Sequence, residues 1–370
     1  MKFSCERYLL LAAVNTAGRC AASKSPIPAL EGLLIEAGAD VKITGYDLKK
    51  GIYTHFPADV SEPGAIVLGA KIFGEIVRSL PDGVVTISSG ENYAVTIRCG
   101  ASVFNIIGSD AEEYPELPTV DTQNSVGLPQ KLLGQMIRQT IFAVSDNESR
   151  PVYTGALFEV EGNTLSVVAV DGYRLALRRE NVEGEGLESC RFIVPGTALN
   201  DLEKLCADTD DKVDITVGAK HISFVVGDTV LISRRLEGEF LNYKKSIPQE
   251  FNIRVKIERS ELLRVVSRVS LIIDEKIKNP LRLTFGDGEL ALTCATGVGK
   301  ADDRCPISGD GKGLEIGFNN RYLLDALKAA PAEELTLCLN TDSSPCVIRA
   351  ADGSDAFSYM ILPVRLKAGA

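Results

Sequence analysis

The stretch ALFEVEGNTLSVVAVD, residues 156–171, has the form of a β-hairpin. Apolar and polar residues alternate on both sides of a Gly-containing turn, which is typical of two strands with one buried face. Two other stretches have the same form: GLLIEAGADVKITGYD, residues 32–47, and LRLTFGDGELALTCAT, residues 281–296. One chain unit therefore occurs three times. Its spacing is that of a domain and exceeds the short periods of solenoid repeats.

The neighbours of the three hairpins repeat as well. Each hairpin follows a predicted helix and is followed by an apolar strand that runs into a second helix. Two further alternating strands complete the unit, so that each domain reads helix, strands, helix, strands. The first helices are expected in residues 5–17, 129–144 and 258–273, and the second in the segments 65–80, 192–206 and 315–330. In the third of the first helices one buried stripe is expected, formed by Leu262, Val265, Val266 and Val269.

Polar, proline-bearing segments join the repeats. They lie at residues 110–121 and 237–250, and each carries an aromatic residue in its middle. They predict three domains, 1–118, 119–248 and 249–370. Two helices on one face of antiparallel sheets give an α+β class, with the other face open to water. Similar domains joined by similar linkers favour a closed ring formed by a two-fold homodimer, which would also protect the edge strands at the two ends of the chain.

The composition is that of a soluble globular protein. Of 370 residues, 45% are hydrophobic and 24% are charged, which leaves no room for a disordered or fibrous class. No apolar run is long enough for a transmembrane helix. The first twenty residues imitate a signal peptide, but Glu6 interrupts the basic region and Arg19 spoils a cleavage site. An amphipathic helix is the better interpretation.

Residues that carry chemistry are scarce. The nine cysteines are scattered without a C-x-x-C pair, which favours reduced thiols in a cytoplasmic protein and disfavours zinc. The only histidines, His55 and His221, stand in unrelated contexts, so the commonest general base is nearly missing. The segment TGVGKAD, residues 296–302, lacks the first glycine and the hydroxyl of a phosphate loop, and residues 208–211 lack the glycine and glutamate of a calcium loop. We expect no metal, no cofactor and no catalysis.

Four features together resemble the bacterial DNA polymerase III beta subunits, the sliding clamps. They are the triple repeat, DGYRLA at residues 171–176, GFNNRYLLDAL at 317–327 and MILPVRL at 360–366. The resemblance covers essentially the whole chain. It implies a ring of two chains with twelve helices around a channel for duplex DNA, and sheets on the outside. It implies no chemistry by the clamp itself.

The resemblance also implies a pocket for partner peptides between the second and third domains. Its partners would be the clamp loader, the alpha subunit of the replicative polymerase, and other polymerases and repair proteins, with no membrane involved. Apolar side chains would anchor the peptide and arginine would orient it. The matching residues are Tyr153, Val170, Gly172, Tyr173, Arg174, Leu175, Leu241, Lys245, Ser246, Met360, Leu362, Pro363, Val364 and Arg365.

A net charge of −10 is wrong for a tight DNA binder, but a ring that encircles DNA needs no tight binding. A modestly basic lining is expected on the six helices, at Lys71, Arg78, Lys131, Arg138, Arg264, Arg268 and Arg321. For any one of these residues, an ordinary solvated helix face is an equally good interpretation. Lys24, Arg150 and Tyr322 match DNA-contacting positions of the family.

Leu271, Ile272 and Ile273 overfill the stripe of their helix, which predicts a homodimer contact at Leu271 and Ile272. Some residues depart from the family pattern. Leu241 stands where many clamps have proline, and Tyr173 stands where some have histidine. Pro151 and Val152 replace aromatic residues at DNA-contacting positions. A short tail follows Arg365. Two alternatives remain open: a clamp-fold paralogue without a processivity role, and an α+β enzyme.

Overall fold

The computed structural model describes residues 1–120, 124–182, 189–274, 279–309 and 311–366. Two compact units make up the chain. The first unit comprises residues 1–134 and 200–235, and the second comprises residues 135–199 and 236–370. The middle repeat is thus divided between the two units, while the first and third repeats each lie in one.

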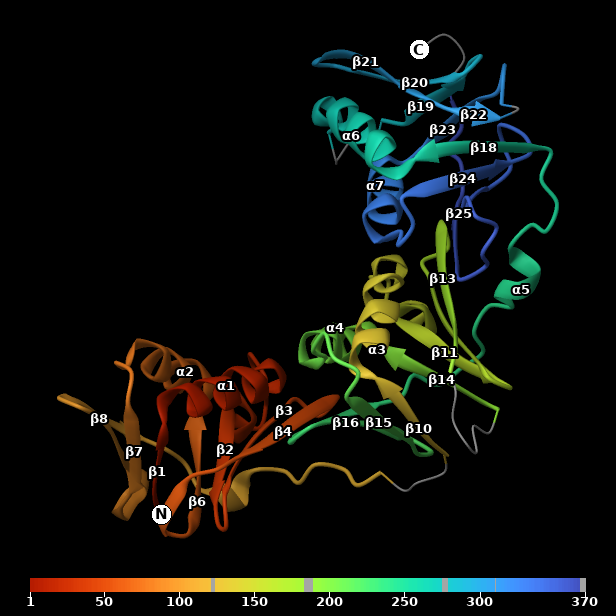
Figure 1. Cartoon of the computed structure of the whole chain (residues 1–370). Helices are drawn as coiled ribbons and strands as arrows, with labels where there is room; N and C mark the ends of the chain where they lie inside the picture. The colour runs from red at the N-terminus through yellow and green to blue at the C-terminus, as the bar shows by residue number, and fades with distance from the viewer. Residues whose placement is uncertain (121–123, 183–188, 275–278, 310, 367–370) are drawn as a thin grey trace. The chain divides into compact units, whose positions relative to one another are not determined.

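Two antiparallel sheets form the first unit among the described residues (Figure 1). The five-stranded sheet has the order β5 (Asp59–Glu62), β1 (Lys2–Glu6), β7 (Val84–Ser89), β8 (Ala94–Cys99), β9 (Ser102–Ile107). The eight-stranded sheet has the order β10 (Asn124–Pro129), β15 (Lys212–Val217), β16 (His221–Val226), β17 (Thr229–Arg234), β4 (Lys50–Phe56), β3 (Val41–Tyr46), β2 (Gly32–Ala37), β6 (Gly64–Gly69).

Two further antiparallel sheets form the second unit, within the part of the chain described. The nine-stranded sheet has the order β14 (Cys190–Pro195), β11 (Gly155–Glu161), β12 (Thr164–Val170), β13 (Arg174–Asn181), β26 (Phe357–Ile361), β25 (Cys346–Ala350), β24 (Glu334–Leu339), β18 (Ile253–Glu258), β22 (Ser308–Gly309). The four-stranded sheet has the order β21 (Gly299–Pro306), β20 (Glu289–Thr296), β19 (Leu281–Phe285), β23 (Glu315–Phe318).

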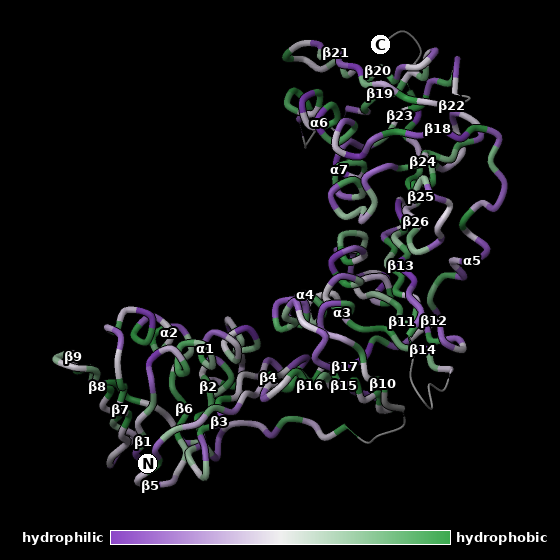
Figure 2. The backbone as a smooth tube through the Cα atoms, in the orientation of Figure 1, coloured by the Kyte–Doolittle hydropathy of each residue, from purple (hydrophilic) through white to green (hydrophobic). Residues whose placement is uncertain are grey.

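Each repeat carries the two expected helices. The first helices are α1 (Arg7–Ala17), α3 (Gln130–Arg138) and α6 (Arg259–Val269), and the second are α2 (Ala70–Ser79), α4 (Gly196–Leu205) and α7 (Asn320–Ala329). The predicted stripe of α6 is confirmed, because Leu262, Val265, Val266 and Val269 are buried. A short additional helix, α5 (Tyr243–Ser246), lies in the second linker. Figure 2 shows hydrophobic residues concentrated in the strands and helices.

The predicted α+β class, with three repeats of antiparallel strands and two helices each, is confirmed, but two features were not anticipated. A strand precedes each first helix, since β1, β10 and β18 end where α1, α3 and α6 begin. The sheets also cross the predicted domain boundaries. Strand β17 pairs with β4, where Leu231 faces Ile52, and β13 pairs with β26, where Leu175 faces Met360. Hydrophobic periodicity reports which face of a strand is buried and carries no information on which edge it pairs with.

Close packing of helix against sheet depends on particular glycines. Gly45 lies in β3 opposite the end of α1, and a Cβ at this position would come within 2.0 Å of the carbonyl oxygen of Ala17. Such a distance is far below van der Waals contact, so the helix or the strand would have to move. Gly18, at the end of the same helix, has α-helical φ and ψ, and a Cβ added there would have no atom within 4 Å.

We therefore expect Gly45→Ala to lower the free energy of unfolding by about 3 kcal/mol, because the added methyl group collides with backbone. Gly18→Ala is the matched control. It should leave stability unchanged or raise it by about 0.5 kcal/mol, since alanine reduces the entropy of the unfolded chain. Chemical denaturation of the two variants and the parent protein measures both effects. Equal stability of the two variants would contradict this assignment.

Candidate functional site

The turn between β12 and β13 is held by the side chain of Asp171. Its Oδ1 accepts hydrogen bonds from the backbone N–H groups of Tyr173 at 2.8 Å and Arg174 at 3.0 Å. Gly172 supplies the positive φ of 93° that the turn requires. The backbone N–H of Leu362 donates to the carbonyl oxygen of Tyr173 at 2.9 Å. A backbone hydrogen bond therefore links the turn to the C-terminal segment, and the two were predicted to act together.

The predicted pocket residues all lie in the second unit, and the structure divides them into floor and rim. Val170, Leu175 and Met360 are buried in one apolar cluster, against which Tyr153 and Leu241 pack. The rim residues are at least partly exposed and come from the turn, α5 and the C-terminal segment: Gly172, Tyr173, Lys245, Ser246, Leu362, Pro363, Val364 and Arg365. The rim, together with the partly exposed Tyr153 and Leu241, is open to a partner without rearrangement.

Arg174 belongs to neither group. It is 8% exposed, and its guanidinium bonds to Asp171 at 2.9 Å and to Asp325 of α7 at 2.6 Å. The guanidinium also lies over the ring of Tyr322, at 4.5 Å from its centroid, and over that of Phe142 at 5.5 Å. Two of its N–H groups and its planar face are thus used within the protein. The residue fixes the turn against α7, which is a positioning role, and its expected part in orienting a bound peptide stays a prediction.

The helix α5 was missed in the sequence, where this segment was interpreted only as a linker. The side chain of Asn242 caps it by accepting a hydrogen bond from the backbone of Lys245, an N-cap signal that the sequence LNYKKS contained. Tyr243 is 2% exposed, and its hydroxyl donates to Glu159 of β11. Lys244 contacts the same carboxylate at 3.0 Å. Burial favours a higher pKa for Glu159, but these two partners outweigh it, and the pKa is lowered.

The predicted DNA-contacting cations are exposed to solvent: Lys24, Lys71, Arg78, Lys131, Arg138, Arg150, Arg264, Arg268 and Arg321. Several have carboxylate partners. Arg268 bonds to Asp303 of β21 at 2.5 Å, which raises the pKa of the arginine and lowers that of the aspartate. Arg264 pairs with Glu261, and Lys131 lies 3.3 Å from Asp208. Tyr322 is half-buried and stacks on Tyr173, with 6.3 Å between the ring centroids. The helices thus present cations whose field is partly neutralised.

Leu271 is the most exposed large apolar residue among those described, at 85%, and lies in a single turn, η7 (Ser270–Ile272), directly after α6. Ile272 beside it is half-buried. The neighbouring strand β21 is an outer strand of its sheet, and in the first unit β9 is likewise an outer strand, with Ile107 at its end 81% exposed. Apolar side chains beside unpaired strand edges are features of an interface.

The described residues contain no cluster of three or more His, Cys, Asp or Glu suited to a metal ion. None of the helices in those ranges is long and apolar enough to cross a membrane. Seven of the nine cysteines are buried. Burial raises the pKa of Cys5 and of Cys20 to about 12, so these thiols stay protonated at neutral pH and are poor nucleophiles.

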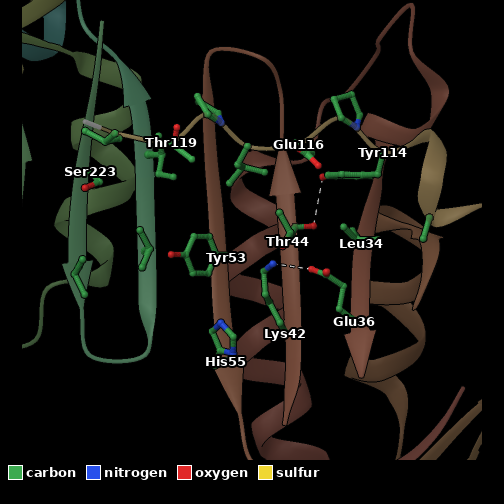
Figure 3. A pocket seen from close by; sticks show the side chains of 18 of the residues that line it. Leu34, Glu36, Lys42, Thr44, Tyr53, His55, Tyr114, Glu116, Thr119 and Ser223 are labelled. Carbon is green, nitrogen blue, oxygen red and sulfur yellow. Dashed lines mark hydrogen bonds and ion pairs between the residues drawn. The ribbon is translucent and has the colours of Figure 1, made fainter. Parts of the chain in front are cut away.

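A groove of 1010 Å³ lies in the first unit, at a place that sequence reasoning did not single out. Figure 3 shows it on the face of the eight-stranded sheet, where side chains of β2, β3, β4 and β16 line it and the linker with Tyr114, Glu116 and Thr119 crosses one end. Lys42 and Glu36 form an ion pair of 2.7 Å within it. The groove is distinct from the predicted peptide pocket, which lies in the second unit.

Three family models match the chain in succession. They are the N-terminal domain of the DNA polymerase III beta subunit over residues 1–118, its central domain over 127–242 and its C-terminal domain over 244–365. Among curated proteins, the beta sliding clamp of Halalkalibacterium halodurans is 35% identical, and that of Bacillus subtilis is 32% identical. Both alignments cover 99% of this chain and 100% of the relative.

Solved structures of DNA polymerase III beta subunits have a similar fold. A putative DNA polymerase III beta subunit from Eubacterium rectale has a TM-score of 0.93 at 34% identity, and the DNA polymerase sliding clamp of Bacillus subtilis has a TM-score of 0.93 at 31% identity. A sliding clamp from Pseudomonas aeruginosa, solved bound to griselimycin, has a TM-score of 0.93 at 28% identity. Each comparison covers 99% of this chain and 100% of the other.

The position of Arg174 predicts a large effect on stability. Arg174→Ala should lower the free energy of unfolding by about 3 kcal/mol, because it leaves two carboxylates without their cation. Arg174→Lys should recover only part of this loss, since lysine lacks the planar fork. Arg365→Ala, an exposed control from the same predicted set, should change stability by less than about 0.5 kcal/mol. Urea unfolding curves test the series, and a neutral Arg174→Ala would contradict the positioning role.

Proposed function

The chain belongs to the bacterial DNA polymerase III beta subunit family, the sliding clamps, and we propose that two copies of it close into a ring around duplex DNA and tether polymerases there. In this role the protein is a processivity factor of DNA replication. The matches extend over all three repeats and nearly the full length of the chain, so no repeat required for a ring is missing.

The observation that carries the homodimer is a repeated strand pairing. Strand β17 of the middle repeat pairs with β4 of the first, and β26 of the third repeat pairs with β13 of the middle one. In the order of strands along each repeat, β9 corresponds to β17 and β26, and β21 corresponds to β4 and β13. Strands β9 and β21 are the two members of this set that pair on one edge only in the described residues, β9 with β8 and β21 with β20. In a two-fold dimer, β9 of each copy would pair with β21 of the other. This equivalent pairing would form at both junctions between the copies and close the ring.

Duplex DNA is the proposed occupant of the ring, contacted through phosphates without regard to sequence. The exposed cations on α2, α3, α6 and α7, together with Lys24, Arg150 and Tyr322, supply these contacts. Local carboxylates weaken the attraction, which suits a protein that has to slide. The net charge of −10 acts in the same direction.

A peptide pocket in the second unit is the proposed tether. Its rim, with Tyr173, Leu362, Pro363, Val364 and Arg365, provides exposed apolar and cationic groups above a buried apolar floor. Short motifs from the clamp loader, the polymerase alpha subunit and other polymerases and repair proteins would bind there. The protein itself would bind no cofactor, catalyse no reaction and act in the cytoplasm.

Loading onto nicked circular DNA tests the function. The parent protein should stay on the circle through gel filtration and should leave when a restriction enzyme linearises the DNA, because a ring slides off a free end. The proposal of a topological clamp would be overturned if the protein stayed on the DNA after linearisation. A marked preference for base sequence would also overturn it.

Leu271→Lys combined with Ile272→Lys provides the matched variant for this experiment. The two side chains are partly or fully exposed, so the protein should stay folded while the apolar contact between copies is lost. We expect a monomer by sedimentation and no retention on circular DNA. A folded variant that remains dimeric would place the interface elsewhere.

Peptide binding should depend on the rim. Leu362→Ala with Tyr173→Ala should reduce the affinity for a polymerase C-terminal peptide by about 2 kcal/mol or more, because partly exposed anchors concentrate binding energy. Its melting temperature should change little. Leu175→Ala serves as the contrast: the side chain is 1% exposed, so its truncation costs about 2 to 5 kcal/mol of stability. Isothermal titration with undiminished binding by the rim variant would locate the tether elsewhere.

A further inference from the structure

The repeats place a glutamate at the same position in both units, with different surroundings. Glu36 of β2 follows Gly32 by four residues, and Glu159 of β11 follows Gly155 by four. In their hairpins Glu36 faces Lys42, and Glu159 faces Ser166. The sheet face around each glutamate is crossed by the linker that leads to the next repeat. The two faces therefore form an internal comparison.

In the second unit the linker fills this face. Helix α5 inserts Tyr243, which is 2% exposed, and its hydroxyl donates to Glu159. The next residue, Lys244, contacts both Glu159 and Glu161, the latter at 2.6 Å. An aromatic residue followed by lysine is thus the pair that occupies this face and neutralises its carboxylates.

In the first unit the linker leaves the face open. Residues 114–120 contain no helix, and the groove of 1010 Å³ remains beneath and beside them (Figure 3). Tyr114 is buried at one end, where its hydroxyl reaches the carbonyl oxygen of Thr44 at 3.4 Å. Tyr53, Val225 and Val230 line the remaining space and are only half-buried.

Two polar features of the groove favour a ligand. Thr44 is 2% exposed, and its hydroxyl has no hydrogen-bond partner among the described residues, which is costly for a buried polar group. The charges of the lining are unequal. Lys42 neutralises Glu36, whereas Glu112 and Glu116 on the linker side are exposed and have no cation within the lining apart from Lys42. The free charge of the groove is therefore negative and complements a cation.

We propose that this groove binds a short basic segment of a partner protein, in which an aromatic residue is followed by lysine. The aromatic ring enters the space beside Tyr53 and Val230, and the lysine faces Glu112 and Glu116. The segment would occupy the first unit as Tyr243 and Lys244 occupy the second. This site is separate from the proposed peptide pocket, so a clamp could hold a partner at a second point on the same subunit.

The chain itself supplies a probe. A fluorescein-labelled synthetic peptide of residues 241–247, LNYKKSI, carries the aromatic–lysine pair and has two lysines and no acidic side chain. The intact protein already fills its second-unit face with this segment, so the first-unit groove is the open place for the peptide. We expect saturable binding by fluorescence anisotropy. A peptide with alanine in place of the tyrosine and first lysine should bind at least about tenfold more weakly.

Charge reversal identifies the location. Glu112→Lys with Glu116→Lys should weaken binding about tenfold, and Val230→Glu, which puts a charge on the floor, should do the same. Glu113→Lys is the matched control, because Glu113 is exposed in the same turn but does not line the groove, and it should change affinity less than about twofold. Absence of binding by the parent protein, or equal binding by all folded variants, would overturn the proposal.

Discussion

Backbone pairing between strands of successive repeats is the constraint on which the rest of the structure depends. A strand edge leaves N–H and C=O groups without partners, and neighbouring repeats satisfy these groups for each other. Strand β17 closes on β4 and β13 closes on β26, so that separate hairpins become sheets of eight and nine strands within the described residues. The middle repeat is consequently divided between two compact units. The same constraint leaves β9 and β21 as the edges from which the proposed ring closes.

Side chains reinforce each of these junctions at an equivalent turn. In the first repeat Asp47 caps the turn before β4 by accepting backbone hydrogen bonds at 2.8 and 2.9 Å, as Asp171 does before β13. The first residue of the new strand then carries a cation to the second helix of the next repeat: Lys50 pairs with Asp201 of α4, and Arg174 pairs with Asp325 of α7. Burial lowers the pKa of Lys50, but its pairing with Asp201 outweighs this and raises it.

The third repeat has no cation at the first residue of the equivalent strand, β21. Gly299 stands at the position of Lys50 and Arg174, and Glu75 of α2, which corresponds to the two aspartates, is exposed. Breaking a buried ion pair is costly, so the junctions within a chain resist separation more than a junction without such a pair. In the proposed ring, the contact between copies would therefore be the one that opens. In the same proposal, the carboxylate partners of Arg264 and Arg268 would weaken the attraction of these two residues to DNA and so allow the ring to slide.

The sequence by itself determined the threefold repeat, the hairpin and the two helices of each repeat, and the apolar stripe of α6, because periodicity and turn residues act within a few positions of the chain. It also brought the turn at Asp171 and the C-terminal segment into one predicted set, through the family resemblance. Only the tertiary structure decided which strand edges meet, since pairing between strands distant in the chain leaves no local pattern. Burial likewise appears only in three dimensions: Arg174 lies between Asp325 and two aromatic rings, and Glu36 borders a groove while Glu159 is covered by α5. These roles depend on what packs against a residue from elsewhere in the chain.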